Sequence, residues 1–330
     1  MSEKIYEISL GPFQGITDVV YRRLFHQYFG GIDRYYTPFF TGFVRIPSNG
    51  NPPEEIDPRL NDFQQTIPQI LSKEADEIQQ FGKVCHQFGF SEINWNLGCP
   101  YPRVANKKRG SGLLPYPAEI ENILKQLDGN LPVGLSIKCR LGFYSPDEMD
   151  ALTDIFNAFP LSELIVHARI GKQLYKGAVL EDDFAALQQK INSRLVYNGD
   201  IFSTEHFERF QHSFPEVNHW MVGRGLLANP FLALEMKGIC SFSDLEKKEI
   251  IRKFMEELFR IRLKNAGGNL SCLGRMKELW SYMVWSFDEP IVAWRLIRKA
   301  RTIEEYRSAM DEIFLQLHWI GKGFTSDRSW

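Results

Sequence analysis

The sequence predicts an α/β fold, a (β/α)8 TIM barrel, followed by a smaller all-α helical C-terminal domain. Over about the first 230 of the 330 residues, short apolar runs of strand length alternate with loops and helical patterns. This alternation indicates parallel strands joined by right-handed crossovers, and eight strands in this length are typical of the barrel. After Pro230 the alternation stops and only helical patterns follow.

Eight runs are expected to form the barrel strands, because each is short, mostly apolar and bounded by turn-forming residues. They are Ile8–Leu10, Tyr35–Thr37, Ile67–Leu71, Glu92–Asn96, Leu135–Arg140, Leu164–His167, Leu195–Asn198 and His219–Val222. The helical patterns between several of them are Asp18–Phe29, Ser72–Phe88, Pro117–Leu127 and Asp147–Phe159. A doubly wound open sheet is the alternative fold, but it usually carries a G-x-G-x-x-G after its first strand, where this chain has GPFQG.

The C-terminal part is expected to consist of helices. Two pairs at capping-box spacing predict helix starts; they are Ser243 with Glu246 and Thr302 with Glu305. Two more helical patterns cover about 273–286 and 290–300, and the expected turns are Gly267-Gly268 and Asp288-Glu289-Pro290. We therefore predict a barrel domain over residues 1–240 and a helical domain over residues 241–330.

Composition favours a soluble, cytoplasmic globular protein. Apolar residues make up 44% and charged residues 24% of the chain, as in ordinary globular domains. The apolar runs are far shorter than the roughly 20 residues that span a bilayer, and the start MSEKIYEISL is too charged for a secretory signal. The five cysteines form no C-x-x-C pair, so we expect free thiols and no metal site.

Charge gives only a weak indication of a nucleic-acid partner. The net charge is −2, but residues 241–330 hold 16 Lys and Arg against 13 Asp and Glu, which leaves the rest of the chain acidic. Two basic groups are candidates for phosphate contacts, although such a group, taken alone, is more often a solvated surface. They are Lys107-Lys108-Arg109 and the set Arg295, Arg298 and Lys299, which has the i, i+3, i+4 spacing of one helix face.

Polar groups follow nearly every predicted strand, at the end of a TIM barrel where active sites lie. They are Gly11-Pro12-Phe13, Gln69, Asn96-Leu97-Gly98-Cys99, Lys138 and Arg140, His167 and Arg169, Asn198-Gly199-Asp200, and Gly223-Arg224-Gly225. Glycine-rich turns after strands seven and eight bind phosphate in many such barrels. We therefore expect a ligand that carries a phosphate.

Two side chains at these strand ends have specific chemistry. Lys138 lies in an apolar run and needs a polar or anionic partner, which is either a barrel carboxylate or a cofactor that accumulates negative charge, such as a reduced flavin. Cys99 lies in a loop between Gly98 and Pro100, the kind of position where reactive thiols occur. His167, taken alone, is more often a core histidine than a ligand.

In their order along the chain, these motifs resemble the tRNA-dihydrouridine synthase family over about residues 8–235. The specific signal is Asn-x-Gly-Cys-Pro followed by Gly-x-Leu-Leu. The matching segments are Leu10–Asp18, Asn94–Pro100, Gly110–Leu114, Ser136–Gly142, His167–Arg169, Gln173 with Tyr175 and Gly177, Asn198–Ile201, and Gly223–Gly225 with Asn229-Pro230.

The resemblance implies an FMN enzyme that reduces the C5=C6 bond of uridine in tRNA, with NADPH as reductant. Hydride would pass from flavin N5 to C6, and Cys99 would donate a proton to C5 from the opposite face of the base. The base would have to be turned out of its stack. We expect the helical domain to grip the tRNA and the protein to be a monomer.

The resemblance also assigns site residues by position. The flavin and its phosphate would be held by Pro12, Phe13, Gln69, Lys138, His167, Asn198, Gly199, Asp200, Gly223 and Arg224. The RNA would be held by Asn96, which would help to hold the base, and by Arg103, Lys107, Lys108, Arg109, Arg140, Arg295, Arg298 and Lys299.

This chain departs from the family pattern in three places. Gly11-Pro12-Phe13 replaces the usual Ala-Pro-Met, which should alter packing against the flavin ring. Arg103 replaces a lysine and changes the geometry of a phosphate contact. Leu180–Phe184 replaces the usual Ala-Asp-Trp.

Two other functions fit parts of the sequence. One is a flavin barrel that reduces a small enone or a free pyrimidine, with the helical domain used for dimerisation. The other is a catalytically silent RNA-binding relative, against which the intact set of Cys99, Lys138 and His167 speaks.

Overall fold

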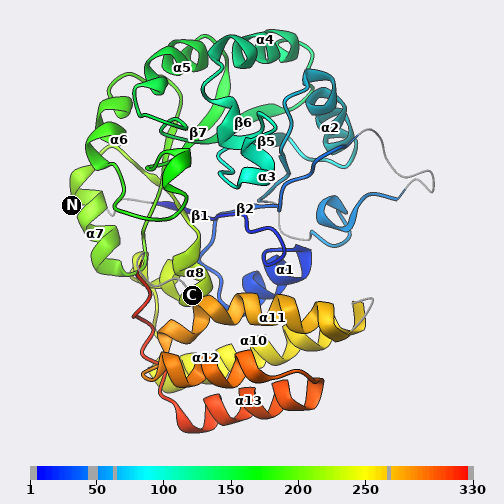
Figure 1. The fold of residues 1–330 in the computed structure, drawn as a ribbon, viewed down its shortest axis with the longest axis vertical. Coiled ribbons are helices and arrows are strands. Elements are labelled where there is room, and N and C mark those ends of the chain that lie inside the picture. The colour runs from blue at the N-terminus through cyan, green and yellow to red at the C-terminus, as the bar shows by residue number, and fades with distance from the viewer. Residues whose placement is uncertain (1–5, 44–50, 62–64, 266–268, 326–330) are drawn as a thin grey trace. The chain divides into compact units, whose positions relative to one another are not determined.

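The computed structural model describes residues 6–43, 51–61, 65–265 and 269–325 (Figure 1). Within these ranges the strands form one parallel sheet in the order β3-β2-β1-β9-β8-β7-β6-β5-β4. The strands are β1 (Glu7–Leu10), β2 (Arg34–Tyr36), β3 (Thr66–Ile67), β4 (Gln69–Ile70), β5 (Glu92–Leu97), β6 (Gly134–Arg140), β7 (Leu161–His167), β8 (Leu195–Asn198) and β9 (His219–Val222).

The two strands at the ends of this order are consecutive in the chain, so the sheet closes into a barrel. Only Pro68 separates β3 from β4; β3 pairs with β2, and β4 pairs with β5. Proline has no N–H for the ladder, but its carbonyl still accepts the N–H of Asn94 at 2.8 Å. The predicted barrel of eight strands is confirmed, with the third strand divided at Pro68.

Each predicted helical pattern forms a helix. The helices are α1 (Val19–Tyr28), α2 (Ala75–Gln87), α3 (Pro102–Ala105), α4 (Pro117–Leu127), α5 (Glu148–Asn157), α6 (Glu181–Gln188), α7 (Thr204–Ser213), α8 (Arg224–Ala228), α9 (Leu232–Met236), α10 (Asp244–Asn265), α11 (Asn269–Met283), α12 (Pro290–Lys299) and α13 (Ile303–Gln316). The structure thus adds α3 and α6 to α9, for which no pattern was named. Asp18 caps α1 by accepting the N–H of Tyr21 at 2.9 Å. Proline stands in the first turn of both α4 and α12. None of the described helices is long and apolar enough to cross a membrane.

The chain packs into two compact units. The first comprises Met1–Pro12, Asp33–Gly199 and Ser213–Met221, and the second comprises Phe13–Ile32, Asp200–His212 and Val222–Trp330. The first unit contains the strands, apart from Val222 at the end of β9. In its centre Tyr36, Ile67, Ile165, Val196 and Met221 form a buried apolar cluster. A domain boundary near residue 240 stays a prediction.

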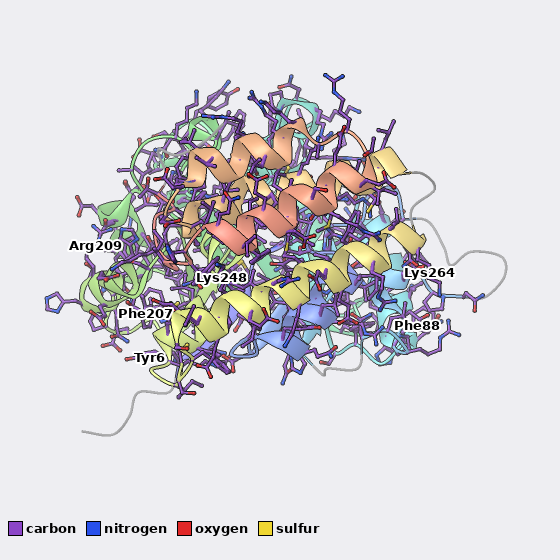
Figure 2. All side chains as sticks on the ribbon, turned by 90° about the horizontal axis from the view of Figure 1, so that it is seen from below. Tyr6, Phe88, Phe207, Arg209, Lys248 and Lys264 are labelled. Atoms are coloured by element: carbon purple, nitrogen blue, oxygen red, sulfur yellow. The ribbon has the colours of Figure 1, made fainter. Side chains whose placement is uncertain are left out.

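The second unit contains the predicted C-terminal helices. Both capping boxes are present, because Glu246 accepts the N–H of Ser243 at 2.8 Å and Thr302 accepts the N–H of Glu305 at 3.1 Å. Figure 2 labels Lys248 and Lys264, which lie near the two ends of the long helix α10. Asp288 and Glu289 lie between the helical segments, as expected, and Pro290 is the first residue of α12. Gly267-Gly268 lies outside the described residues.

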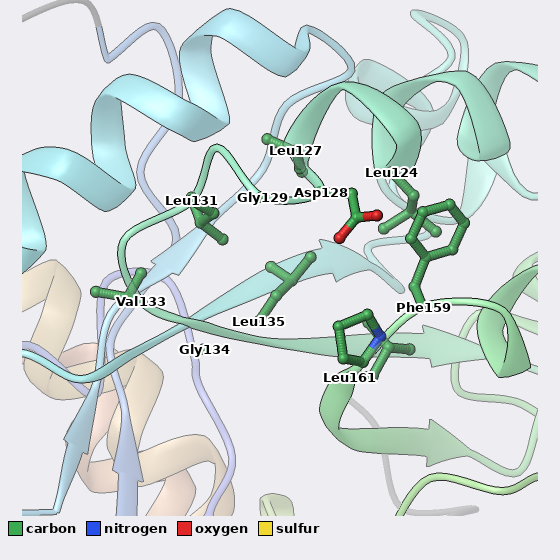
Figure 3. Close-up of a pocket in the computed structure, with 11 residues that line it drawn as sticks. Leu124, Leu127, Asp128, Gly129, Leu131, Val133, Gly134, Leu135, Phe159 and Leu161 are labelled. Atoms are coloured by element: carbon green, nitrogen blue, oxygen red, sulfur yellow. The ribbon is translucent and has the colours of Figure 1, made fainter.

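One apolar cavity of about 220 Å³ lies in the first unit, beside the start of β6. Leu124 and Leu127 of α4, Leu135 of β6 and Phe159 line it, and Figure 3 shows the carboxylate of Asp128 among these side chains. The cavity is at the N-terminal ends of β6 and β7. Active sites of TIM barrels lie at the opposite ends of the strands, so we do not place the chemistry here.

Candidate active site

Cys99 follows β5 in a turn whose backbone is held by three side chains. Asn96 Oδ1 accepts the N–H groups of Gly98 and Cys99, each at 3.0 Å. The carbonyl of Cys99 accepts both the backbone N–H and the hydroxyl of Ser111, each at 3.1 Å. Arg140 Nε donates to the carbonyl of Gly98 at 3.0 Å. The thiol is therefore presented from a fixed position rather than from a free loop.

The glycines of the Gly-Ser-Gly segment are required by contact with this turn. Gly110 has φ 56°, and a Cβ there would lie 2.6 Å from the carbonyl oxygen and 2.9 Å from the Cβ of Cys99. A Cβ on Gly112 would lie 2.2 Å from the carbonyl oxygen of Ala105. A side chain at Gly110 would displace the backbone of Cys99, and one at Gly112 would displace Ala105 at the end of α3.

The surroundings of Cys99 favour a protonated thiol. The thiol is partly exposed, and burial raises its pKa above the usual value. The N–H of Tyr101 and the positive charges of Arg140, Arg103 and Lys138 act in the opposite direction. The thiol is thus neutral near pH 7, as a proton donor must be, and the thiolate left after donation has stabilising partners.

A chain of amide side chains connects the Cys99 turn to the barrel interior. Asn96 Nδ2 donates to Gln69 Oε1 at 2.7 Å, and Gln69 Nε2 donates to Asn94 Oδ1 at 2.8 Å. Asn94 in turn donates to the hydroxyl of Ser136 at 2.9 Å. Gln69 and Asn94 are fully buried. The side-chain amides of Asn96 and Gln69 both bind other members of this hydrogen-bonded series, and through these contacts they position Cys99. Their contacts with the base and the flavin stay predictions.

Lys138 on β6 has a neutral partner. Its Nζ lies 2.9 Å from Asn198 Oδ1, and Asn198 Nδ2 donates to the carbonyl of Met221 at 2.8 Å. Burial, together with the positive charge of Arg140, lowers the pKa of Lys138 to about 8. The observed partner of Lys138 is thus an amide and not a barrel carboxylate. Because an amide is neutral, the positive charge of Lys138 stays available to an anionic ligand.

His167 and Arg169 at the end of β7 form a second polar group. Arg169 Nη1 lies 3.3 Å from His167 Nε2; because a guanidinium only donates, this ring nitrogen is the acceptor. Arg169 also donates to the carbonyl of Gly177. The His167 ring lies 6.1 Å from the ring of Tyr175, which belongs to the Gln-x-Tyr-x-Gly segment.

Arg140 is predicted to bind substrate, but here it is buried and donates to the backbone. Besides Gly98 it donates to the carbonyl of Ile170 at 3.0 Å, and its guanidinium lies 5.2 Å from the centre of the Tyr175 ring. Burial lowers the pKa of Arg140 to about 10. Its observed contacts fix the loops that follow β5 and β7.

In the second unit, Arg224 and Asp200 form an ion pair at 2.7 Å. Asp200 has φ 43°, an uncommon conformation for a residue with a side chain. A Cβ on Gly223 would lie 3.0 Å from the ring of Phe13, so the glycine permits this ring to approach the backbone. Arg224 is also 5.2 Å from the centre of the Phe202 ring.

The two predicted basic groups, around Lys108 and on α12, differ in the contacts that their charged side chains make. Lys108 forms an ion pair with Glu119 at 2.9 Å, and Arg109 donates to the hydroxyl of Thr41 at 3.3 Å. Exposed cations are Arg103, Lys107, Arg295, Arg298 and Lys299. The last three share the side of α12 that lies away from its buried residues Ala293 and Ile297.

At the other end of the strands, Glu163 is held by two arginines and a histidine. It accepts from His219 at 2.9 Å, from Arg34 at 2.6 Å and from Arg194 at 3.0 Å. Glu7 and His219 lie near enough to Glu163 to share a metal ion. The two arginines already neutralise Glu163, however, and groups at this end of a TIM barrel serve stability.

Comparisons with known proteins agree with one another. The family model described as dihydrouridine synthase (Dus) matches residues 9–316. The chain is 26% identical to the tRNA-dihydrouridine(16) synthase of Neisseria meningitidis serogroup B over 321 residues, 92% of this chain and 94% of that protein. It is 26% identical to tRNA-dihydrouridine synthase B of Pasteurella multocida over 263 residues, 76% of this chain and 77% of that protein. It is 30% identical to a probable tRNA-dihydrouridine synthase of Staphylococcus epidermidis over 236 residues, 67% of this chain and 69% of that protein.

Proposed function

The chain belongs to the dihydrouridine synthase family, and on this premise we propose how its barrel reduces uridine in tRNA to dihydrouridine. The observation that carries the proposal is the fixed turn of Cys99. A neutral thiol is held there by Asn96 and Ser111, near the positively charged Lys138. Proton donation beside a cation that can stabilise negative charge is what the reduction of a conjugated C=C bond requires.

FMN is the cofactor that family membership implies, and the residues of the barrel fit it. The ammonium of Lys138 is held by the neutral amide of Asn198, so its charge can balance an anionic reduced flavin. When bound, FMN reduced by NADPH supplies the hydride for C6 of the uracil.

Cys99 gives its proton to C5 of the uracil. The N–H of Tyr101 and the charges of Arg140 and Arg103 then stabilise the thiolate until solvent returns a proton. Asn96 is a positioning residue in this scheme, because its carbonyl oxygen holds the N–H of Cys99 while its amide is held by Gln69. Exposed cations, among them Arg103 and the three on α12, bind phosphates and place the RNA. We also propose that the protein acts as a monomer in the cytoplasm.

The test compares Cys99→Ala with the native protein on tRNA that lacks dihydrouridine. The variant should keep its FMN but form dihydrouridine roughly 100-fold or more slowly, the usual contribution of a positioned acid. Cys240→Ala changes a thiol outside the site and should react at the native rate. Undiminished reduction by Cys99→Ala would remove Cys99 from this role, and reduction of free uridine at the rate seen with tRNA would favour a small-molecule reductase.

A further inference from the structure

We propose that an aromatic surface beside the Cys99 turn stacks the unpaired RNA bases that flank the target uridine. This surface, called the tyrosine platform below, consists of Tyr101, Phe143, Tyr144, Lys172 and Tyr175. The inference rests on the proposed function and extends it to nucleotides that do not react.

Three neighbouring strands supply the platform. Tyr101 follows β5, Phe143 and Tyr144 follow β6, and Tyr175 follows β7; β6 pairs with β5 on one side and with β7 on the other. The rings of Phe143 and Tyr144 are 4.7 Å apart and nearly perpendicular, and those of Tyr101 and Tyr175 are 6.4 Å apart. The rings therefore share the end of the barrel where Cys99 lies.

Two of these rings are exposed to solvent although their loops are fixed. The exposed fraction is 61% for Tyr144 and 48% for Tyr101. The carboxylate of Glu148 accepts the N–H of Phe143 at 2.8 Å and that of Tyr144 at 2.9 Å. Gly142 has φ 82°, and a Cβ there would lie 2.1 Å from the carbonyl oxygen of Ser145, so this tightly packed turn requires glycine. A rigid, exposed aromatic ring binds a partner with little loss of conformational entropy.

Positive charge is interleaved with the rings. Lys172 Nζ lies 5.3 Å from the centre of the Phe143 ring and 5.2 Å from that of Tyr144, within the range of a cation–π contact. Arg103 and Lys176 are exposed in the loops that carry Tyr101 and Tyr175. Aromatic rings for bases with cations for phosphates are the combination that binds single-stranded RNA.

The platform adjoins the group that would protonate the base. The N–H of Tyr101 donates to the sulfur of Cys99, and Tyr175 contacts Arg140, which holds the carbonyl next to Cys99. A uracil at the thiol would thus have its neighbouring nucleotides over Tyr101 and Tyr144. Since every base has a π-face, the platform should accept different flanking bases.

The test measures the affinity of Tyr101→Ala, Tyr144→Ala and the double variant for tRNA that lacks dihydrouridine and for a short oligouridylate. Because stacking on an aromatic ring adds to the affinity for each base, each alanine should weaken binding roughly ten-fold, and the double variant more. Tyr144→Phe keeps the ring and should bind like the native protein. Leu315→Ala changes an exposed apolar side chain on α13 and should also have no effect.

FMN content and dihydrouridine formation are recorded for the same variants. Native affinity of the double variant for both RNAs would overturn the platform, even if the enzyme reduces tRNA. If the native protein forms no dihydrouridine but the alanine variants bind RNA more weakly, the proposed function fails while the platform stands. If Tyr144→Phe weakens binding as much as Tyr144→Ala does, the effect is due to the hydroxyl, and this result would contradict stacking.

Discussion

Burial acts in opposite directions on the two ionisable groups at the centre of the site. It raises the pKa of the Cys99 thiol and lowers the pKa of the Lys138 ammonium to about 8, because it disfavours the charged form of each. Near pH 7 the thiol is therefore neutral and the lysine is still mostly charged. One group can give a proton while the other stabilises an anion.

The affinity for FMN should depend on pH through Lys138. The anionic reduced flavin binds the protonated lysine better, so the apparent Kd of reduced FMN should rise as the pH increases above about 8 and the lysine of the free protein loses its proton. Lys138→Met should bind FMN more weakly and without this dependence. The Kd of oxidised FMN from fluorescence quenching, combined with the reduction potential of the bound flavin, gives the Kd of reduced FMN for both proteins at each pH. An equal Kd for the native protein at about pH 7 and about pH 9.5 would contradict the role of Lys138.

Several residue roles could not be predicted from the sequence, because they depend on strand register. Gln69 lies beside Asn94, and Asn96 lies beside Lys138. The strand ends alone predict these polar groups at the mouth, but not that Asn96 and Gln69 bind each other, nor that Arg140 is buried against backbone carbonyls. The exposed fractions of Tyr101 and Tyr144 are equally beyond what the motif indicates.

At the scale of elements, the barrel was predictable because its strands are short apolar runs between breakers. Pro68 divides one of them into β3 and β4, where the sequence indicates a single strand. The Gly110–Leu113 turn was not predicted as an element; its conformation follows from contact with Cys99. The sequence thus predicted the elements whose conformation follows from a local residue pattern. It did not predict the Gly110–Leu113 turn, whose conformation depends on contact with a distant segment.

Gly110→Ala should damage the site, whereas Gly129→Ala should not. Both glycines have positive φ, 56° and 67°, so alanine costs about 1–2 kcal/mol of backbone strain at each. A Cβ at Gly129 meets nothing within 4 Å, but one at Gly110 meets Cys99. Thermal unfolding and the rate of dihydrouridine formation distinguish the two. Equal activities of the two variants would show that the contact with Cys99 does not matter.

The basic face of α12 gives a prediction about salt. Replacing Arg295, Arg298 and Lys299 by glutamine should weaken tRNA binding and reduce the slope of log K against log salt by about 0.7–0.9 for each phosphate that the face neutralises in the native protein. Lys125→Gln on α4 removes an exposed charge elsewhere and should leave the slope unchanged. An unaltered slope in the triple variant would exclude this face from RNA binding.

At the scale of the whole molecule, a buried arginine joins the C-terminal helices to the loop after the first strand. Arg262 of α10 donates to the carbonyl of Ile16 at 2.5 Å and to the carboxylate of Asp18 at 3.1 Å. Both partners belong to the same compact unit as α10. The predicted helical domain is therefore tied to the segment that carries Phe13.

Arg262→Met should lower the free energy of unfolding by about 3 kcal/mol, because it leaves the buried carbonyl of Ile16 without this donor and removes the buried ion-pair partner of Asp18. Arg260→Met removes a guanidinium that is 68% exposed and paired with Glu257, so its effect should stay within about 0.5 kcal/mol. Denaturant titration compares the two variants. If both unfold at the native midpoint, the arginine does not stabilise this unit.

The most direct test of the account is the conversion of defined uridines in tRNA that lacks dihydrouridine, by FMN-loaded protein with NADPH, followed by mass spectrometry of the nucleosides. We predict that dihydrouridine appears with the native protein and not, in the same time, with Cys99→Ala. Oxidation of NADPH by the loaded protein with every uridine of the tRNA left intact would contradict the account.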